Sequence, residues 1–369
     1  MDEQAVDEAV RLHEIAVQRR DAGRASEALE PCKQALVILE RECGDCHPDV
    51  ANVLNALGEL HEDLAAYAEA ERCYRRAVAI TETLPLDQEV LARLRVQALV
   101  RLAGIDRVQG RLDDAEARLR TALDLAESEL GGNDLEVSSV CNGLGIVYKY
   151  AARFDEARAQ YDRALVVSAA VHGPDHPELA SIYHNLGGLE HARNRHPEGE
   201  SYARRSVELR ELALGSGHPV VAADVAALAA LVDGQGRHDE AEALYRRVIA
   251  VFEATYGADH YELAINLNNL GVLTAARGEH TEAERYYAHA LAIKERLVGP
   301  DHPDVAMTVH NLAALHAQQG RDAEAEAGYQ RALRIFTATL PAHHPKIATC
   351  REHLATLPDR RDRSVAAGC

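Results

Sequence analysis

The run Cys43-Gly44-Asp45-Cys46-His47 concentrates more potential chemistry than any other stretch of the chain. Its C-x-x-C-H spacing is the attachment signature of c-type haem, in which two thiols hold the porphyrin and the histidine ligates the iron. However, the histidine of this run returns at the same place in a repeated linker. We therefore interpret the run as a linker, with metal binding or redox pairing of the two cysteines as the alternatives.

A histidine at this linker position recurs six times, and proline follows it in five cases: His47, His176, His218, His260, His302 and His344. One histidine per repeated unit advances along the structure, so these side chains do not converge, whereas a metal needs three or four ligands around a point. Glycine before them ends one helix, and proline is tolerated in the first turn of the next. We expect capping and turn roles, with neither a bound metal nor any other cofactor.

Signatures of catalysis are missing from the sequence. It contains no G-x-S-x-G, no glycine-rich phosphate loop after a strand and no H-E-x-x-H. Carboxylates such as Glu282 and Glu284 stand at the starts of predicted helices, where negative charge is stabilised by the helix dipole. We therefore do not expect an enzyme.

The composition of the chain limits the classes of partner and the cellular locations that we expect. The 369 residues include 40 Lys+Arg and 59 Asp+Glu, for a net charge of -19, which disfavours nucleic acid as a partner. No apolar run approaches the roughly 18 residues that cross a bilayer, so we expect no membrane association. The acidic start MDEQAVDEAV lacks the features of a secretory signal, and seven scattered cysteines do not suggest a disulfide framework. A cytoplasmic protein is the expectation.

The linkers punctuate a 42-residue repeat, which is the strongest signal in the sequence. The units align on an apolar anchor residue, with a single 45-residue step between Leu57 and Leu102: Ile15, Leu57, Leu102, Leu144, Leu186, Leu228, Leu270, Leu312 and Leu354. A small residue follows each leucine by thirteen positions, and a ring often follows four later: Tyr74, Tyr161, Tyr245, Tyr287 and Tyr329. Small residues let two helices approach closely, and the ring fills the space beside them.

Each unit reads as a helical hairpin. Two segments with helical periodicity flank a turn such as AARGEH at residues 275–280. Units of this size cannot bury their apolar faces alone and must stack on their neighbours. The sequence therefore predicts an all-α, right-handed superhelical solenoid. We expect residues 1–357 to form a single solenoid domain of about eight hairpins plus a closing helix, and residues 358–369 to form a disordered tail.

This pattern resembles the tetratricopeptide repeat, and the 42-residue period with its DHPDVA linker resembles the kinesin light chain subclass. The resemblance covers roughly residues 9–357. It implies a concave groove lined by the first helix of each hairpin, in which a peptide would bind. It does not imply association with a motor.

The resemblance also places the groove residues at fixed distances from the anchor leucine. Two positions before it stand amides and imidazoles that would hold a peptide backbone: Asn55, Asn142, His184, Asn268 and His310. Five positions after it, Arg107, Lys149 and His191 form a basic stripe in a protein of opposite net charge. An amide both donates and accepts hydrogen bonds, and a basic patch focuses an anionic ligand. Ordinary solvated charge is the alternative for the stripe.

We therefore expect a protein–protein interaction module that acts as an adaptor, scaffold or sensor. It would bind an extended peptide in its concave groove, and an acidic one if the basic stripe takes part. The alternative is the regulatory solenoid of a bacterial signalling or transcription system, acting with a separate effector enzyme or DNA-binding protein. The partner's identity and the oligomeric state stay open.

Overall fold

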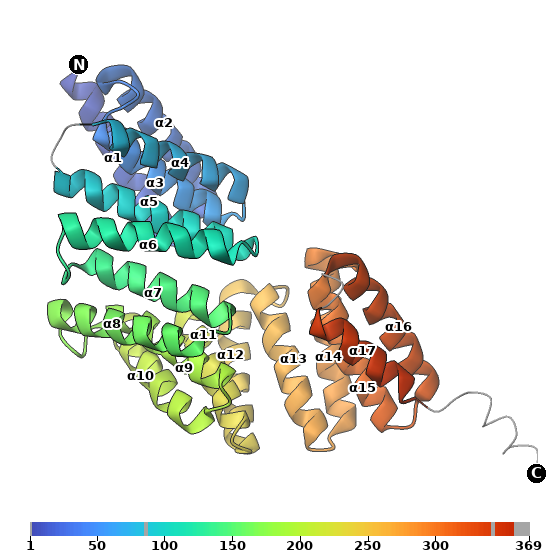
Figure 1. The fold of residues 1–369 in the computed structure, drawn as a ribbon. Helices are drawn as coiled ribbons and strands as arrows, with labels where there is room; N and C mark the ends of the chain where they lie inside the picture. Colours follow the sequence, from blue (N-terminus) through green and yellow to red (C-terminus); the bar gives the residue numbers. More distant parts are fainter. Residues whose placement is uncertain (1, 85–87, 341–343, 358–369) are drawn as a thin grey trace, which may run out of the picture. The chain divides into compact units, whose positions relative to one another are not determined.

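The computed structural model describes residues 2–84, 88–340 and 344–357, and all regular elements in those ranges are helices (Figure 1). Helices follow one another in the predicted alternation, and a final helix closes the series. The prediction of an all-α solenoid of helical hairpins is confirmed. The predicted tail at residues 358–369 lies outside the described residues.

The chain divides into two compact units, Met1–Leu189 and Glu190–Cys369, with the division inside α9. The first unit contains α1 (Glu3–Asp21), α2 (Ala25–Cys43), α3 (Pro48–Asp63), α4 (Tyr67–Thr83), α5 (Gln88–Val108), α6 (Leu112–Glu129), α7 (Leu135–Tyr150), α8 (Phe154–His172), the 3-10 helix η1 (Pro177–Leu179) and most of α9 (Ala180–Ala192). The second contains the end of α9 and then α10 (His196–Leu214), α11 (Pro219–Asp233), α12 (His238–Tyr256), α13 (Tyr261–Ala276), α14 (His280–Val298), α15 (Pro303–Gln318), α16 (Asp322–Thr339) and α17 (Pro345–Ala355).

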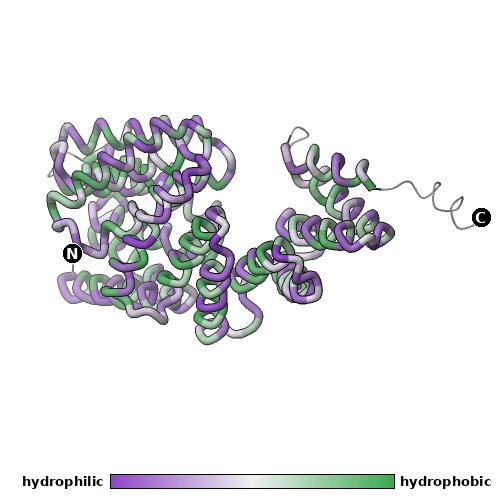
Figure 2. Tube along the Cα trace, turned by 90° about the horizontal axis from the view of Figure 1, so that it is seen from below, coloured by the Kyte–Doolittle hydropathy of each residue, from purple (hydrophilic) through white to green (hydrophobic). Residues whose placement is uncertain are grey.

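Amphipathic helices build the core. Hydrophobic and hydrophilic residues alternate around the turns of the helices (Figure 2), so each helix buries one stripe against its neighbours. The predicted ring positions are buried: Tyr74 and Tyr161 have no exposed surface, and Tyr287 is 3% exposed. None of the helices in the described ranges is long and apolar enough to cross a membrane.

A close approach of glycine to tyrosine fixes the two helices of a hairpin. Gly145 on α7 lies against Tyr161 on α8, and a Cβ at this glycine would come within 2.5 Å of the ring. Gly271 lies in the same way against Tyr287, at 2.8 Å. A side chain at either position would clash with the tyrosine ring, so this close packing of the two helices requires glycine.

The linker histidines cap helices, as predicted. Each Nδ1 accepts a hydrogen bond from the backbone N–H two residues further on, at 3.2–3.3 Å: His47, His176, His218, His260, His302 and His344. This bond satisfies one of the free N–H groups at the start of a helix. An Nδ1 that accepts a hydrogen bond requires the ring tautomer with its N–H at Nε2.

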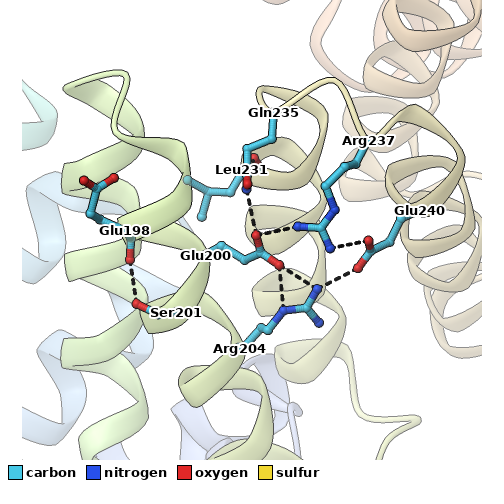
Figure 3. A network of polar contacts seen from close by, with 8 residues as sticks. All are labelled: Glu198, Glu200, Ser201, Arg204, Leu231, Gln235, Arg237 and Glu240. Carbon is cyan, nitrogen blue, oxygen red and sulfur yellow. Dashed lines mark hydrogen bonds and ion pairs between the residues drawn. The ribbon is translucent and has the colours of Figure 1, made fainter.

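Ion pairs connect one hairpin to the next. On α10, Glu200 accepts hydrogen bonds from Gln235 and Arg237 at the α11–α12 turn, each at 2.7 Å, and from Arg204 at 2.8 Å (Figure 3). Burial works against the charge of Glu200, but these donors outweigh it and lower the pKa of Glu200 to about 2. Arg153 with Glu116, at 2.5 Å, makes the corresponding pair in the first unit.

Candidate peptide-binding groove

A cavity of about 570 Å³ opens in the first unit along the first helices of three successive hairpins, α3, α5 and α7. Its floor is small or apolar, with Val100 and Gly104 on α5 and Ile146 on α7. Two of the predicted groove residues, Arg107 and Asn142, line it. The first helices therefore form the hollowed face at this place, where the repeat register puts the predicted stripe.

The carboxylates around this cavity already have protein partners. Glu59 pairs with Arg101 at 2.5 Å, and Glu62 accepts a hydrogen bond from the hydroxyl of Tyr74 at 2.5 Å. Glu136 accepts one from Gln97 at 2.8 Å, and burial raises the pKa of both Glu62 and Glu136. Each of these acidic groups is therefore held by a partner within the fold.

Arg107 and Lys149 form a basic pair on one aromatic ring. The Arg107 guanidinium lies 5.1 Å and the Lys149 ammonium 5.8 Å from the ring centroid of Tyr150, within the range of cation–π attraction. Neither cation has a carboxylate partner among the residues that the structure describes. Burial, and then the charge of Arg107, lower the pKa of Lys149.

The hydroxyl of Tyr161 is a further polar group close enough to Arg107 and Tyr150 to be affected by their charges. Its side chain is fully buried, and its hydroxyl has no hydrogen-bond partner in the described part of the chain. Burial and then the neighbouring Tyr150 raise the pKa of Tyr161, which Arg107 opposes. The repeat pattern identified Tyr161 as a packing ring only, and Tyr150 escaped notice because it stands outside the recurring positions.

The predicted amides bridge successive first helices. Asn142 Oδ1 accepts from Asn185 Nδ2 at 2.8 Å, and Asn268 Oδ1 accepts in the same way from Asn311 at 3.2 Å. Asn55 is buried and donates through Nδ2 to the carbonyl of Leu94 at 3.0 Å. The Asn142 oxygen is therefore occupied, whereas its two N–H donors have no partner in the described part of the chain.

None of the predicted histidines is among the residues that line the cavity. His184 is half-buried on α9 in the first unit. His191 belongs to the second unit, where its ring lies 5.3 Å from that of His196, and burial followed by His196 lowers its pKa. His310, also in the second unit, stacks on His353 at 5.0 Å, and burial lowers its pKa to about 4.

Chemically, the cavity wall offers donors. The Arg107 guanidinium and the Asn142 amide hydrogens line it, and Lys149 shares the Tyr150 ring with Arg107. These donors complement oxygen acceptors such as carboxylates and peptide carbonyls. In the described residues no three metal-ligating side chains gather into a potential metal site.

The structure is a solenoid of repeated helical hairpins, and in the first unit the first helices of three hairpins line a cavity. These features define the class of protein. The family model for the tetratricopeptide repeat matches residues 7–83, 94–165, 140–212, 178–254, 220–296, 262–338 and 304–367. The chain therefore belongs to the tetratricopeptide repeat family, as the sequence pattern predicted.

Solved structures share this fold. BtubC (BKLC) from P. vanneervenii is 21% identical with a TM-score of 0.50, over 65% of this chain and 92% of that one. The quorum sensor NprR from B. thuringiensis is 17% identical with a TM-score of 0.61, over 88% and 84%. A signal transduction ATPase of the STAND class with a tetratricopeptide repeat sensor, from Pyrococcus horikoshii, is 14% identical with a TM-score of 0.61, over 89% of this chain and 49% of that one.

Proposed function

We propose that the chain is an interaction module that binds an extended acidic peptide along the cavity of α3, α5 and α7. The observation that carries the proposal is the pair Arg107 and Lys149, two cations on one ring without a carboxylate partner in the described residues. The protein has a net charge of -19, so acidic side chains far outnumber basic ones. Because this basic pair still has no carboxylate partner in the described residues, an anionic ligand is the partner we expect for it.

Asn142 would supply the contact that does not depend on the peptide's sequence. With its oxygen occupied by Asn185, it offers N–H donors to a backbone carbonyl of the ligand. The apolar floor at Val100, Gly104 and Ile146 would take aliphatic parts of the ligand's side chains. For His184, His191, Asn55, Asn268 and His310 a ligand contact stays a prediction.

An array of synthetic peptides tests this function directly. The array should carry acidic sequences, the same sequences with Asp and Glu replaced by Asn and Gln, and scrambled controls. We expect the purified full chain to select the acidic members, and Arg107→Gln to weaken that selection. Equal binding of acidic and amide members would contradict the proposal.

A second candidate is a regulatory solenoid that acts with a separate effector enzyme or DNA-binding protein. The fold it shares with the quorum sensor NprR, and with a signal transduction ATPase that has a tetratricopeptide repeat sensor, favours this candidate. A neighbouring gene for an ATPase or a transcription factor would support it, and purification of a stable complex between the two products would test it.

A further inference from the structure

Lysine is scarce in this chain, and one of the few lysines stands beside the candidate groove. Of the 40 Lys+Arg residues, the lysines are only Lys33, Lys149, Lys294 and Lys346. Lys33 is exposed on α2, whereas Lys294 is buried and donates to Thr308 Oγ1 at 2.9 Å. Lys149 differs from both, because it is half-buried and shares the aromatic ring of Tyr150 with the cation Arg107.

The surroundings of Lys149 penalise its ammonium form and so raise the share of neutral amine. Its Nζ lies over the face of Tyr150, and Arg107 shares that ring. On the side of α9, Gly188 contributes no side chain, and a Cβ at this position would stand 3.4 Å from Nζ. Burial and the positive charge of Arg107 both penalise the ammonium form, which lowers the pKa of Lys149. The neutral amine is the nucleophilic form of lysine.

A place for an oxyanion adjoins this amine. The Arg107 guanidinium has no carboxylate partner in the described residues, and its fork of donors fits a phosphoryl group. The buried hydroxyl of Tyr161 has no hydrogen-bond partner there, and Arg107 is one of the charges that act on it. A reagent that joins an electrophilic carbonyl to a phosphate matches the amine and the guanidinium together.

We propose that Lys149 is a covalent modification site, acylated on Nζ by small acyl phosphates. Arg107 holds the phosphoryl oxygens, and the neutral Nζ attacks the acyl carbonyl carbon. The new N–C bond forms as the C–O bond to phosphate breaks, and the bonding electrons leave with the phosphate oxygen. The proton lost by nitrogen ends on that phosphate. With acetyl phosphate, the products are N-acetyl-lysine and hydrogenphosphate, and no oxidant or reductant is needed.

Acylation would change the groove as well as the residue. It replaces a cation by a neutral amide and leaves Arg107 as the single member of the basic pair. Weaker binding of an acidic peptide follows, and this consequence alone rests on the proposed function.

The test uses the full chain and acetyl phosphate, with the other lysines as internal references. Peptide mass spectrometry follows acetylation of Lys33, Lys149 and Lys346 over time. We expect Lys149 to react roughly threefold to tenfold faster than the exposed Lys33, because a larger share of its amine is neutral and the reagent is held beside it. Acetylation of Lys149 no faster than that of Lys33 would overturn the proposal.

Two arginine variants separate the role of Arg107 from a general loss of charge. Arg107→Gln should bring the rate at Lys149 down to that of Lys33. Arg101→Gln is the matched control, because Arg101 lines the same cavity from the same helix but is already paired with Glu59. It should leave the rate at Lys149 unchanged, and circular dichroism should show that both variants are folded. Equal effects of the two substitutions would contradict the assignment.

A neutral acylating reagent tests the phosphate contact itself. With the N-hydroxysuccinimide ester of acetic acid, Arg107→Gln should slow Lys149 less than it does with acetyl phosphate, since the ester has no phosphoryl group for the guanidinium to hold. Equal slowing with both reagents would contradict the proposal that Arg107 binds the phosphoryl group. No peptide is present in these reactions, so their outcome is independent of whether the groove binds acidic peptides.

Discussion

At the scale of single residues, the packing depends on whether a glycine faces a ring or open space. A Cβ at position 145 would meet the Tyr161 ring at 2.5 Å, whereas a Cβ at position 104 would meet nothing within 4 Å. We expect Gly145→Ala to lower the free energy of unfolding by about 1–3 kcal/mol through overpacking. Gly104→Ala should instead be neutral or gain up to about 1 kcal/mol from helix propensity. Urea denaturation of both variants compares them, and equal destabilisation would contradict the packing described for α7 and α8.

The capping histidines allow a second residue-scale prediction. His218 accepts from the backbone N–H of Val220 at 3.2 Å, so His218→Ala should cost about 1 kcal/mol of unfolding free energy. His218→Asp should retain most of the stability, because a carboxylate also accepts this bond and favours a helix N-terminus. Replacement of the exposed, non-capping His289 by Ala serves as the control. Loss of stability in the Asp variant equal to that in the Ala variant would argue against capping.

The residue-level predictions from sequence succeeded where a role recurs in each unit. The capping histidines and the buried rings such as Tyr161 follow from their spacing alone. The partners of single side chains do not recur, so the sequence did not reveal the stacking of Arg107 and Lys149 on Tyr150. Nor did it reveal that the side-chain oxygen of Asn142 accepts a hydrogen bond from Asn185, because that bond depends on the distance between successive first helices.

At the scale of elements, the closing helix α17 contains a pH-sensitive contact. His353 on α17 stacks on His310 of α15, and Tyr329 of α16 meets both rings. Burial, with a smaller contribution from His353, lowers the pKa of His310 from 6.5 to about 4, so the unfolded chain binds a proton more readily than the folded one. Stability should therefore fall as the pH drops from about 6.5 to about 4, by up to about 2 kcal/mol.

The variant His310→Gln tests this contact, because glutamine does not titrate. Urea denaturation of both proteins across this pH range should give a smaller slope of stability against pH for the variant. Identical slopes would show that His310 does not contribute to the pH dependence.

The elements themselves were largely predictable, because helical periodicity and glycine turns recur in each unit. The 45-residue step was visible in the spacing, but its structural form was not. The first helix there, α5, is 21 residues long, whereas α3 and α7 have 16 residues each. Residues 85–87 before it lie outside the described ranges, and the sequence has no linker histidine at this step.

At the scale of the whole molecule, stability should be local, because each hairpin packs mainly on its neighbours. Tyr287→Ala removes a buried ring and should cost about 3–5 kcal/mol. We expect hydrogen exchange to accelerate in the second unit, near α13 and α14, and to change little in the first unit. Uniform acceleration along the chain would mean that unfolding is a single cooperative event. The period predicted stacking, but the division between Leu189 and Glu190 depends on contacts that one sequence does not reveal.

The central claim is that Arg107, Lys149 and Asn142 bind an acidic peptide. The most direct measurement titrates one selected acidic peptide, and its neutral counterpart with Asn and Gln in place of Asp and Glu, at two salt concentrations. The proteins compared are the wild-type chain, Lys149→Ala, Lys149→Glu, Asn142→Ala and the control Lys33→Glu. Affinity should fall as salt rises, because exposed charges are screened over about 8–10 Å near physiological ionic strength. Lys149→Glu should weaken binding more than Lys149→Ala, since repulsion adds to the lost attraction. Asn142→Ala should cost roughly 1–3 kcal/mol for acidic and neutral peptides alike, and Lys33→Glu should have little effect. Affinity that is insensitive to salt, with Lys149→Glu and Lys33→Glu indistinguishable, would contradict the claim.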